Sequence, residues 1–457
     1  MIEIGKRSLT EKTAKLLCKN FHKIFEERGI TDRISLADLM KTKEKQAIEF
    51  LNEMLKSEIN ISNENLWIIE EALYELEPKE RITMLRKLVL AVSFSTLAAF
   101  SGSVLAAAFD VTDIEGRKVH FEDQPKTFVV ANYIANFMMV GGAPGLEKVV
   151  ALTKDGWEDT RYGEYQVFTK SFPKMKDLPS IGGYHDDILN AEKILSLHPD
   201  VLLIGRTQYA ENSQRIKTFE KAGIRVVVLD YHAMTTANHT LSTEILGKLL
   251  GREKIAEAQN KTYKEALDHV YSTIAKLPQD QLGTKVYMET ASKGLAQYGN
   301  SYNKDVLWGA ILKNIKAANL AENSPQPYMA LDREYVISQN PKVIFIGGSI
   351  WRNKSEGDQM RMGFTVPESQ AQERLANFTK RLGWNMLDAV KEKRVYGVDH
   401  GSLRNMADYT FTQYMAKVLY PEAFKDIDPV GNLNNYYKTY LPELKYDGTF
   451  MIHLNQK

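Results

Sequence analysis

One sequence pattern occurs twice in this chain, as NAEKILSLHPDV at residues 190–201 and as DREYVISQNPKV at residues 332–343. In each copy a Pro follows the Glu by seven residues, and an apolar run then ends at Gly205 or at Gly347 and Gly348. The spacing of the apolar residues before the Pro predicts a short helix, and the Pro predicts a turn into a buried strand. Because this unit of helix, turn and strand is repeated, we predict two α/β halves of one type.

Short apolar strands alternate with amphipathic helices around both copies, from Phe109 onward. The predicted strands are 128–131, 149–152, 201–204, 226–229, 285–289, 343–346 and 394–398, and the predicted helices between them include 191–197 and 213–222. This alternation is typical of parallel sheets covered by helices.

A long amphipathic segment joins the two halves. Apolar residues recur at helical spacing over residues 253–277, and neither Gly nor Pro interrupts them before Pro278. At 1.5 Å per residue such a helix spans on the order of 36 Å, enough to run along both halves. We therefore expect a first lobe at 109–252, a rigid interlobe helix at 253–278, and a second lobe with a C-terminal tail at 279–457.

The chain that precedes the first lobe has a different character. Residues 84–108 combine Arg86 and Lys87, an apolar run and a small-residue exit at Ala106 to Ala108, which is the pattern of a cleaved secretory signal peptide. A permanent membrane anchor is the alternative, but Ser and Gly residues interrupt the run. Residues 1–83 show helical periodicity, so we expect a small all-α extension, which is either an over-extended gene start or a fused domain.

Composition excludes several classes of function. The 59 Lys and Arg residues balance the 58 Asp and Glu residues, and no basic run is interleaved with aromatic residues, so nucleic acid is not an expected partner. Cys18 is the only cysteine in the sequence, which rules out an intramolecular disulfide and a lipid-modified cysteine after the signal segment. We find no nucleophile, acid–base pair or cofactor motif, so we expect neither an enzyme nor a cofactor.

These phrases resemble the class III periplasmic substrate-binding proteins of ABC importers, the family that binds ferric siderophores, haem and cobalamin. The matching stretches, in order, are 191–201, 222–224, 247–251, 317–321, 332–348 and 384–396, within a resemblance that covers residues 109–425. The resemblance implies two Rossmann-like lobes, a rigid interlobe helix, and a ligand between the lobes. It also implies a monomer, soluble in the periplasm after cleavage of the signal peptide, that delivers a metal chelate to a permease dimer in the inner membrane.

Ligands of open parallel sheets bind at the carboxyl ends of the strands, where two facing lobes form a cleft. The loops there carry the predicted ligand contacts Asn132, Tyr133, Tyr184, His185, Arg206, Tyr298, Tyr302, Trp351, Arg352, His400 and Arg404. Aromatic faces can pack on a chelator, and guanidinium groups can clamp anionic oxygens. Each aromatic residue can equally be a packed lid residue.

His185 is the candidate for direct metal ligation, although an isolated His is more often a surface hydrogen-bonding residue and no HxxxH pair supports it. Asp186 and Asp187, which follow it, are expected to cap a helix.

The repeated phrase also places Glu192 and Glu334 at equivalent positions of the two lobes. In the family that the chain resembles, an acidic residue at each place meets arginines of the permease. A Glu in a first helical turn also complements the helix dipole, which alone would account for each residue singly.

Two other functions remain open. A receptor for a bare oxyanion would use Arg, Tyr and backbone NH groups, and a receptor for a free metal ion would need several His or carboxylate ligands. A chelatase-like enzyme rests on fold analogy alone.

Overall fold

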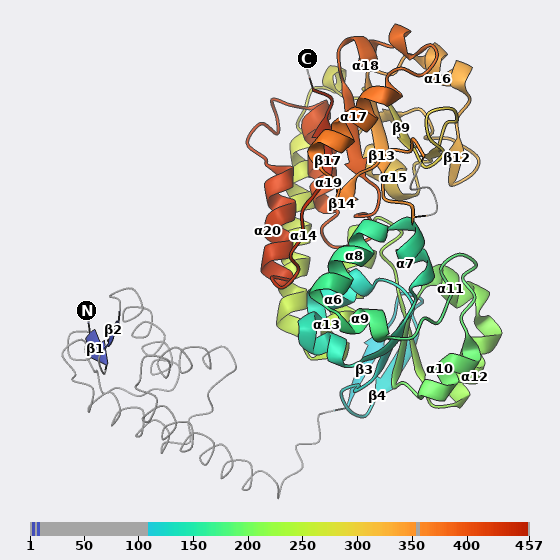
Figure 1. The fold of residues 1–457 in the computed structure, drawn as a ribbon, viewed down its shortest axis with the longest axis vertical. Helices are drawn as coiled ribbons and strands as arrows, with labels where there is room; N and C mark the ends of the chain where they lie inside the picture. The colour runs from blue at the N-terminus through green and yellow to red at the C-terminus, as the bar shows by residue number, and fades with distance from the viewer. Residues whose placement is uncertain (1, 5–6, 10–107, 353–356, 456–457) are drawn as a thin grey trace, which may run out of the picture. The chain divides into compact units, whose positions relative to one another are not determined.

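A computed structural model describes residues 2–4, 7–9, 108–352 and 357–455 of the chain (Figure 1). The chain divides into two units, residues 1–105 and 106–457. The helices expected within residues 1–83 and the signal segment up to residue 107 lie outside the described residues. Along the described part of the chain, no helix is both long enough and apolar enough to span a bilayer.

The described residues of the first unit form a hairpin, which the expectation of helices alone did not include. Strand β1 (Ile2–Ile4) pairs antiparallel with β2 (Arg7–Leu9), with Ile2 opposite Leu9. Apolar and polar residues alternate in the sequence of β1, a period of two that suits a strand.

The first lobe contains a four-stranded parallel sheet in the order β6-β5-β7-β8. Its strands are β5 (Phe128–Val130), β6 (Val149–Leu152), β7 (Val201–Gly205) and β8 (Arg225–Leu229), and the hairpin of β3 (Phe109–Thr112) and β4 (Lys118–Phe121) precedes them. Its helices are α6 (Ile134–Glu147), α7 (Asp155–Thr160), α8 (Tyr162–Ser171), α9 (Lys174–Asp177), α10 (Ala191–Leu197), α11 (Arg206–Glu211), α12 (Ser213–Lys221) and α13 (Thr236–Leu250). Neighbouring residues Leu202 and Leu203 of β7 enter two different apolar clusters, one on each face of the sheet. A sheet buried on both faces explains why its strands are continuously apolar rather than alternating.

The second lobe contains a mixed seven-stranded sheet. Its parallel core is β9 (Lys285–Thr290), β13 (Val343–Gly348) and β15 (Val395–Asp399), with β11 (Ala318–Asn319) parallel to β9, and its antiparallel strands are β10 (Asn300–Tyr302), β12 (Tyr328–Ala330) and β17 (Met451–His453). A small ladder pairs β14 (Gly363–Phe364) with β16 (Gly448–Thr449), and the helices are α15 (Leu307–Asn314), α16 (Arg333–Gln339), α17 (Glu368–Phe378), α18 (Asp388–Lys391), α19 (Tyr409–Leu419) and α20 (Pro429–Tyr440). The C-terminal tail thus supplies an edge strand and a helix of this lobe.

The repeated phrase folds in the same way in both lobes. Asn190 and Asp332 cap α10 and α16, because their side-chain oxygens accept hydrogen bonds from backbone NH groups three residues later, at 3.0 Å in each case. Both helices end on a left-handed residue, His198 with φ 45° and Asn340 with φ 43°. A Pro then leads into β7 or β13, so the predicted duplication is confirmed down to its caps.

Helix α14 (Glu253–Ile274) joins the lobes, and Figure 1 shows it running past both. It begins after Gly251, whose φ of 65° ends α13 in the left-handed conformation that Gly adopts without strain. The Tyr263 hydroxyl of α14 donates to Oδ1 of Asp408 at 2.9 Å, and Nε2 of His239 in α13 lies 3.0 Å from Oδ2 of the same carboxylate. Since Asp408 belongs to the second lobe, these buried bonds attach that lobe to α14 and to the first lobe.

Candidate functional site

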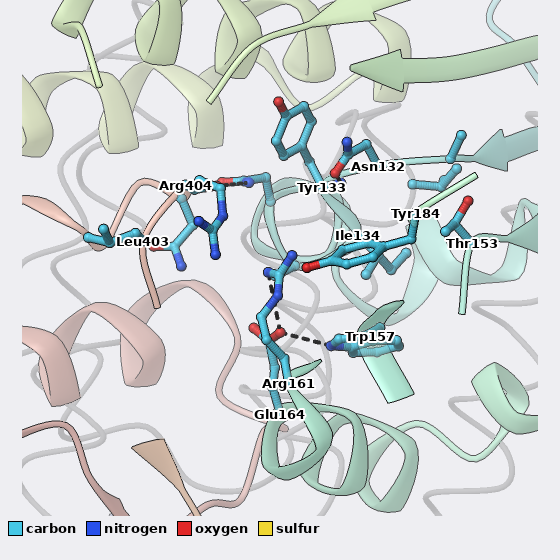
Figure 2. A pocket seen from close by; sticks show the side chains of 15 residues that line it. Asn132, Tyr133, Ile134, Thr153, Trp157, Arg161, Glu164, Tyr184, Leu403 and Arg404 are labelled. Carbon is cyan, nitrogen blue, oxygen red and sulfur yellow. Dashed lines mark hydrogen bonds and ion pairs between the residues drawn. The ribbon is translucent and has the colours of Figure 1, made fainter. Parts of the chain in front are cut away.

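A cavity of about 40 Å³ lies between the two lobes (Figure 2). The first lobe lines it with residues after β5, residues after β6 and the loop before α10, and the second lobe lines it with residues 403–405 after β15. The polar and aromatic residues in its wall are Asn132, Tyr133, Asn136, Thr153, Trp157, Arg161, Glu164, Tyr184, Arg404 and Asn405. The carboxyl ends of parallel strands therefore build this site, as expected for open α/β sheets.

Arg404 is the cation that the second lobe contributes. Its residue is 8% exposed and its φ is 69°, so the backbone holds a strained left-handed conformation at the cavity. Asn136 of α6 fixes this loop, because its Nδ2 donates to the Arg404 carbonyl at 3.0 Å and its Oδ1 accepts from the Met406 NH at 3.3 Å. Burial, and then the nearby Arg161, lower the pKa of Arg404. Burial likewise disfavours the charge of Arg161, but Tyr184, Glu164 and Asp399 raise its pKa, so Arg404 is the less compensated of the two cations.

Arg161 is the cation that the first lobe contributes, at the junction of α7 and α8. Its Nη1 lies 3.8 Å from Oε2 of Glu164, and Figure 2 shows its guanidinium extending toward the hydroxyl of Tyr184. Its Nε atom is buried and has no hydrogen-bond acceptor among the described residues. A buried donor beside a cavity is available to an acceptor atom of a ligand.

The pKa of Tyr184 indicates a positive electrostatic potential at its hydroxyl group. Its hydroxyl lies 3.0 Å from Oγ1 of Thr160. Burial alone would raise the pKa of Tyr184, yet Arg161 and Arg404 outweigh it and lower that pKa. The phenol oxygen therefore lies where negative charge is favoured.

Two histidines near the arginines are held neutral. Burial, followed by Arg404 and Arg161, lowers the pKa values of His232 and His400 well below the ordinary range. Trp308 Nε1 donates to Nδ1 of His400 at 3.0 Å, so the neutral ring carries its proton on Nε2 and can donate from there. The site is thus rich in hydrogen-bond donors, and among the residues that line the cavity two arginines face one carboxyl group, that of Glu164.

The structure brings part of the predicted set together. Asn132, Tyr133, Tyr184 and Arg404 line the cavity. Two further predicted contacts, Tyr302 and His400, pack against each other with ring centroids 5.9 Å apart but are not among the residues that line the cavity, and burial raises the pKa of Tyr302 to about 12.

Other predicted contacts lie outside the lining of this cavity. Tyr298 accepts a hydrogen bond from Trp384 Nε1 at 2.6 Å and packs under Arg381 inside the second lobe. Exposed Arg206 pairs with Glu115 at 2.7 Å and lies 3.9 Å from Asp230, outside the cavity lining.

Residues after β13 contact the other lobe beside the cavity instead of lining it. Arg352 lies over the ring of Tyr162 and 3.9 Å from Glu158, and half-buried Trp351 precedes it. The backbone NH of Tyr162 donates to the Ile350 carbonyl at 3.1 Å, so this loop holds the lobes together.

His185 is exposed and pairs with Asp159 at 3.1 Å. Among the described residues, no group of three or more His, Cys, Asp or Glu side chains is placed to hold a metal ion. The expected capping role of the next two residues is wrong, because Asn190 caps α10 and Asp186 Oδ1 accepts from the NH of Ile188 at 3.0 Å.

The sequence analysis missed Arg161, Trp157 and Glu164. Their segment follows β6, whose strand is predicted correctly at 149–152. The rule that ligands bind at carboxyl ends of strands, applied to β6 as well, would have pointed to this segment and its one arginine.

Comparisons with known proteins agree with this geometry. The family model for periplasmic binding proteins matches residues 153–400. The chain is 24% identical over 320 residues to the uncharacterized ABC transporter substrate-binding lipoprotein YvrC of Bacillus subtilis, covering 69% of this chain and 87% of that protein. It is 25% identical over 378 residues to the molybdate-binding protein MolA of Haemophilus influenzae, covering 78% and 96%. The crystal structure of the TroA-like periplasmic binding protein FepB from Veillonella parvula superposes with a TM-score of 0.71 at 30% identity, covering 76% of this chain and 99% of that one.

Proposed function

Because this chain belongs to the periplasmic binding protein family, and is thus an ABC-type solute-binding protein and not an enzyme, we propose that it captures a compact oxyanion between Arg161 and Arg404. The observation that carries the proposal is the meeting of two guanidinium groups, one from each lobe, at one interlobe cavity. An anion between them would offset their repulsion and bridge the lobes.

The donors around the cavity suit oxyanion oxygens. Guanidinium groups form planar, charge-assisted hydrogen bonds to such oxygens. Tyr184 can donate a neutral hydrogen bond from the cavity wall. The molybdate-binding name of the Haemophilus relative supports a ligand of this class.

The size of the cavity favours a compact ligand over a chelate. It measures about 40 Å³, and one buried water needs roughly 10–15 Å³ by the same measure. A ferric siderophore-type complex, haem or cobalamin is the second candidate, favoured by the aromatic rings of Tyr133, Trp157 and Tyr184 in the wall. Such a ligand would require the lobes to separate. In either case the bound molecule is cargo, and we propose no resident cofactor.

Delivery involves a membrane permease, as for other solute-binding proteins of ABC importers. We propose that exposed Glu192 and Glu334, in the first turns of α10 and α16, dock on the two permease subunits. We also propose that the receptor is a monomer in the periplasm, released by cleavage of the signal segment. Amino-terminal sequencing of periplasmic material should then begin near Ala107 or Phe109, whereas a full-length chain in membranes would favour an anchor.

Calorimetric titration of the purified protein with sodium molybdate, tungstate, sulfate and phosphate, and with a ferric catecholate, tests the ligand class. We expect heat of binding from at least one oxyanion and none from the ferric chelate. Binding of the chelate alone would refute the oxyanion proposal and favour the second candidate.

A further inference from the structure

Two buried carboxyl groups lie behind Arg161, one from each lobe. Glu164 belongs to α8 and is 6% exposed, and Asp399 ends β15 and is 3% exposed. Both line a second cavity of about 10 Å³, together with Arg161. Glu164 also lines the larger cavity, so the carboxyl pair adjoins the proposed anion site.

Hydrogen bonds restrict the side chains of Glu164 and Asp399, so the two carboxyl groups cannot easily move apart. Oε2 of Glu164 accepts from Trp157 Nε1 at 2.8 Å. Asp399 accepts from the Ser402 NH at 2.8 Å, from the Ser402 hydroxyl at 2.6 Å and from the Gly401 NH at 3.2 Å. Each carboxyl is therefore fixed on its own lobe, and the packing of the two lobes places both at one cavity.

Several other titratable groups surround this pair. Arg161 and Arg404 are the nearby cations, Tyr184, Tyr133 and Tyr302 lie around the arginines, Tyr437 of α20 approaches both carboxyls, and the neutral rings of His232 and His400 complete the set. Burial raises the pKa of Asp399 to about 6, despite its hydrogen bonds, and Glu164 adds to the increase. Burial also raises the pKa of Glu164, although Arg161, the Trp157 hydrogen bond and Arg404 oppose it.

Charge balance decides what a bound dianion requires. With both carboxyls ionised, Glu164 and Asp399 cancel the charges of Arg161 and Arg404, so a dianion would leave the buried cluster doubly negative. Excess charge away from water is unfavourable, and a carboxyl in such a place binds a proton instead.

Building on the proposed oxyanion function, we propose that capture of a dianion between Arg161 and Arg404 is accompanied by uptake of one proton by the Glu164 and Asp399 pair. The proton belongs to the pair as a unit, because the two groups are coupled. Glu164 is then a specificity-determining residue, since its protonated form lets a fully ionised oxyanion occupy the site.

The sign of the pH dependence follows from linkage. The bound anion raises the pKa of the pair above its value in the free protein, so the gain in affinity is complete below the free-protein pKa and is lost as pH rises through the bound-state pKa. Across that window the dissociation constant should rise about tenfold per pH unit for one proton.

The test is calorimetric titration with sodium molybdate at pH values below and above about 6, the pKa of Asp399 in the free protein, in buffers of different ionisation enthalpy. We expect the wild type to take up protons on binding and to bind more weakly as pH rises. Glu164→Gln keeps an acceptor for Trp157 and should bind with reduced proton uptake, a flatter pH dependence and tighter affinity than the wild type at the upper pH. Glu257→Gln, an exposed residue of α14 outside the cavity lining, is the matched control and should behave as the wild type.

Binding without proton uptake in the wild type, or unchanged uptake in both Glu164→Gln and Asp399→Asn, would overturn this inference while leaving the oxyanion function intact. Failure of the wild type to bind any oxyanion at any pH would instead refute the proposed function, and this inference with it.

Discussion

The first lobe lines the interlobe cavity with residues after β5, residues after β6 and the loop before α10, whereas the second lobe contributes residues 403–405 after β15. The repeated unit is nevertheless the same in both lobes, with matched caps on α10 and α16. Duplication has therefore preserved the folding unit and not the loops at the strand ends. The shared unit positions those loops, and their unrelated residues determine what the cavity binds.

The largest expected effect concerns the shared unit itself. Ile194 and Val336 occupy equivalent positions in α10 and α16, and each is 0% exposed. Ile194→Ala should lower the free energy of unfolding by about 2–5 kcal/mol, because it leaves a cavity in the first lobe. Val336→Ala removes fewer methyl groups and should lower it by less. Urea denaturation measures both, with exposed Ser196→Ala and Ser338→Ala as controls that should remain within about 0.5 kcal/mol of the wild type. A larger loss of stability for Val336→Ala than for Ile194→Ala would show that the second lobe depends more on its copy of the repeated unit than the first lobe does.

The next largest effect compares the arginines that the two lobes contribute to the cavity. Arg161→Gln and Arg404→Gln should each weaken oxyanion binding by about 1.5–3 kcal/mol, roughly ten- to hundredfold, since each removes a charged hydrogen-bond donor. Arg206→Gln, an exposed arginine outside the lining, should bind as the wild type does. Calorimetry that finds a loss for only one cavity arginine would place the anion on one lobe and contradict its bridging role.

The smallest effect on the isolated protein should come from the docking residues. Reversal of both Glu192 and Glu334 to Lys should change the free energy of unfolding by no more than about 0.5 kcal/mol and leave ligand affinity intact, because both side chains are exposed. Uptake of the ligand by cells should be abolished, since exposed charges govern association with partners. Glu257→Lys with Glu392→Lys, exposed residues of α14 and of the turn after α18, is the matched control. Normal uptake by the Glu192→Lys, Glu334→Lys protein would exclude the docking role.

Much of the fold could be predicted because its signals are local. The caps, the Pro turn and the apolar strand of residues 190–201 lie within one short segment, so the sequence alone predicts α10 and β7. The family and its two-lobed α/β class are confirmed for the same reason. The small strands of the second lobe, such as β14 and β16, lack such signals because each has two residues.

The candidate site could be predicted only in part. Asn132, Tyr133, Tyr184 and Arg404 were found because each lies in a loop near a strand end, a property that the sequence shows. Tyr298 satisfied the same rule, yet it packs against Trp384, because the path of a loop depends on the core beneath it. Loop position in the sequence selects candidates, and packing selects among them.

The sequence by itself determined the duplication, the alternation of strands and helices, the interlobe helix and the lack of any cysteine after Cys18, because periodicity, caps and composition are properties of neighbouring residues. Only the tertiary structure brought Arg161 to Arg404 and Glu164 to Asp399, pairs whose members belong to different lobes. Their separation in the chain leaves no local pattern, and their electrostatics arise from burial when the lobes meet. The charge of the cavity, and with it the class of ligand, is therefore a product of packing between the lobes.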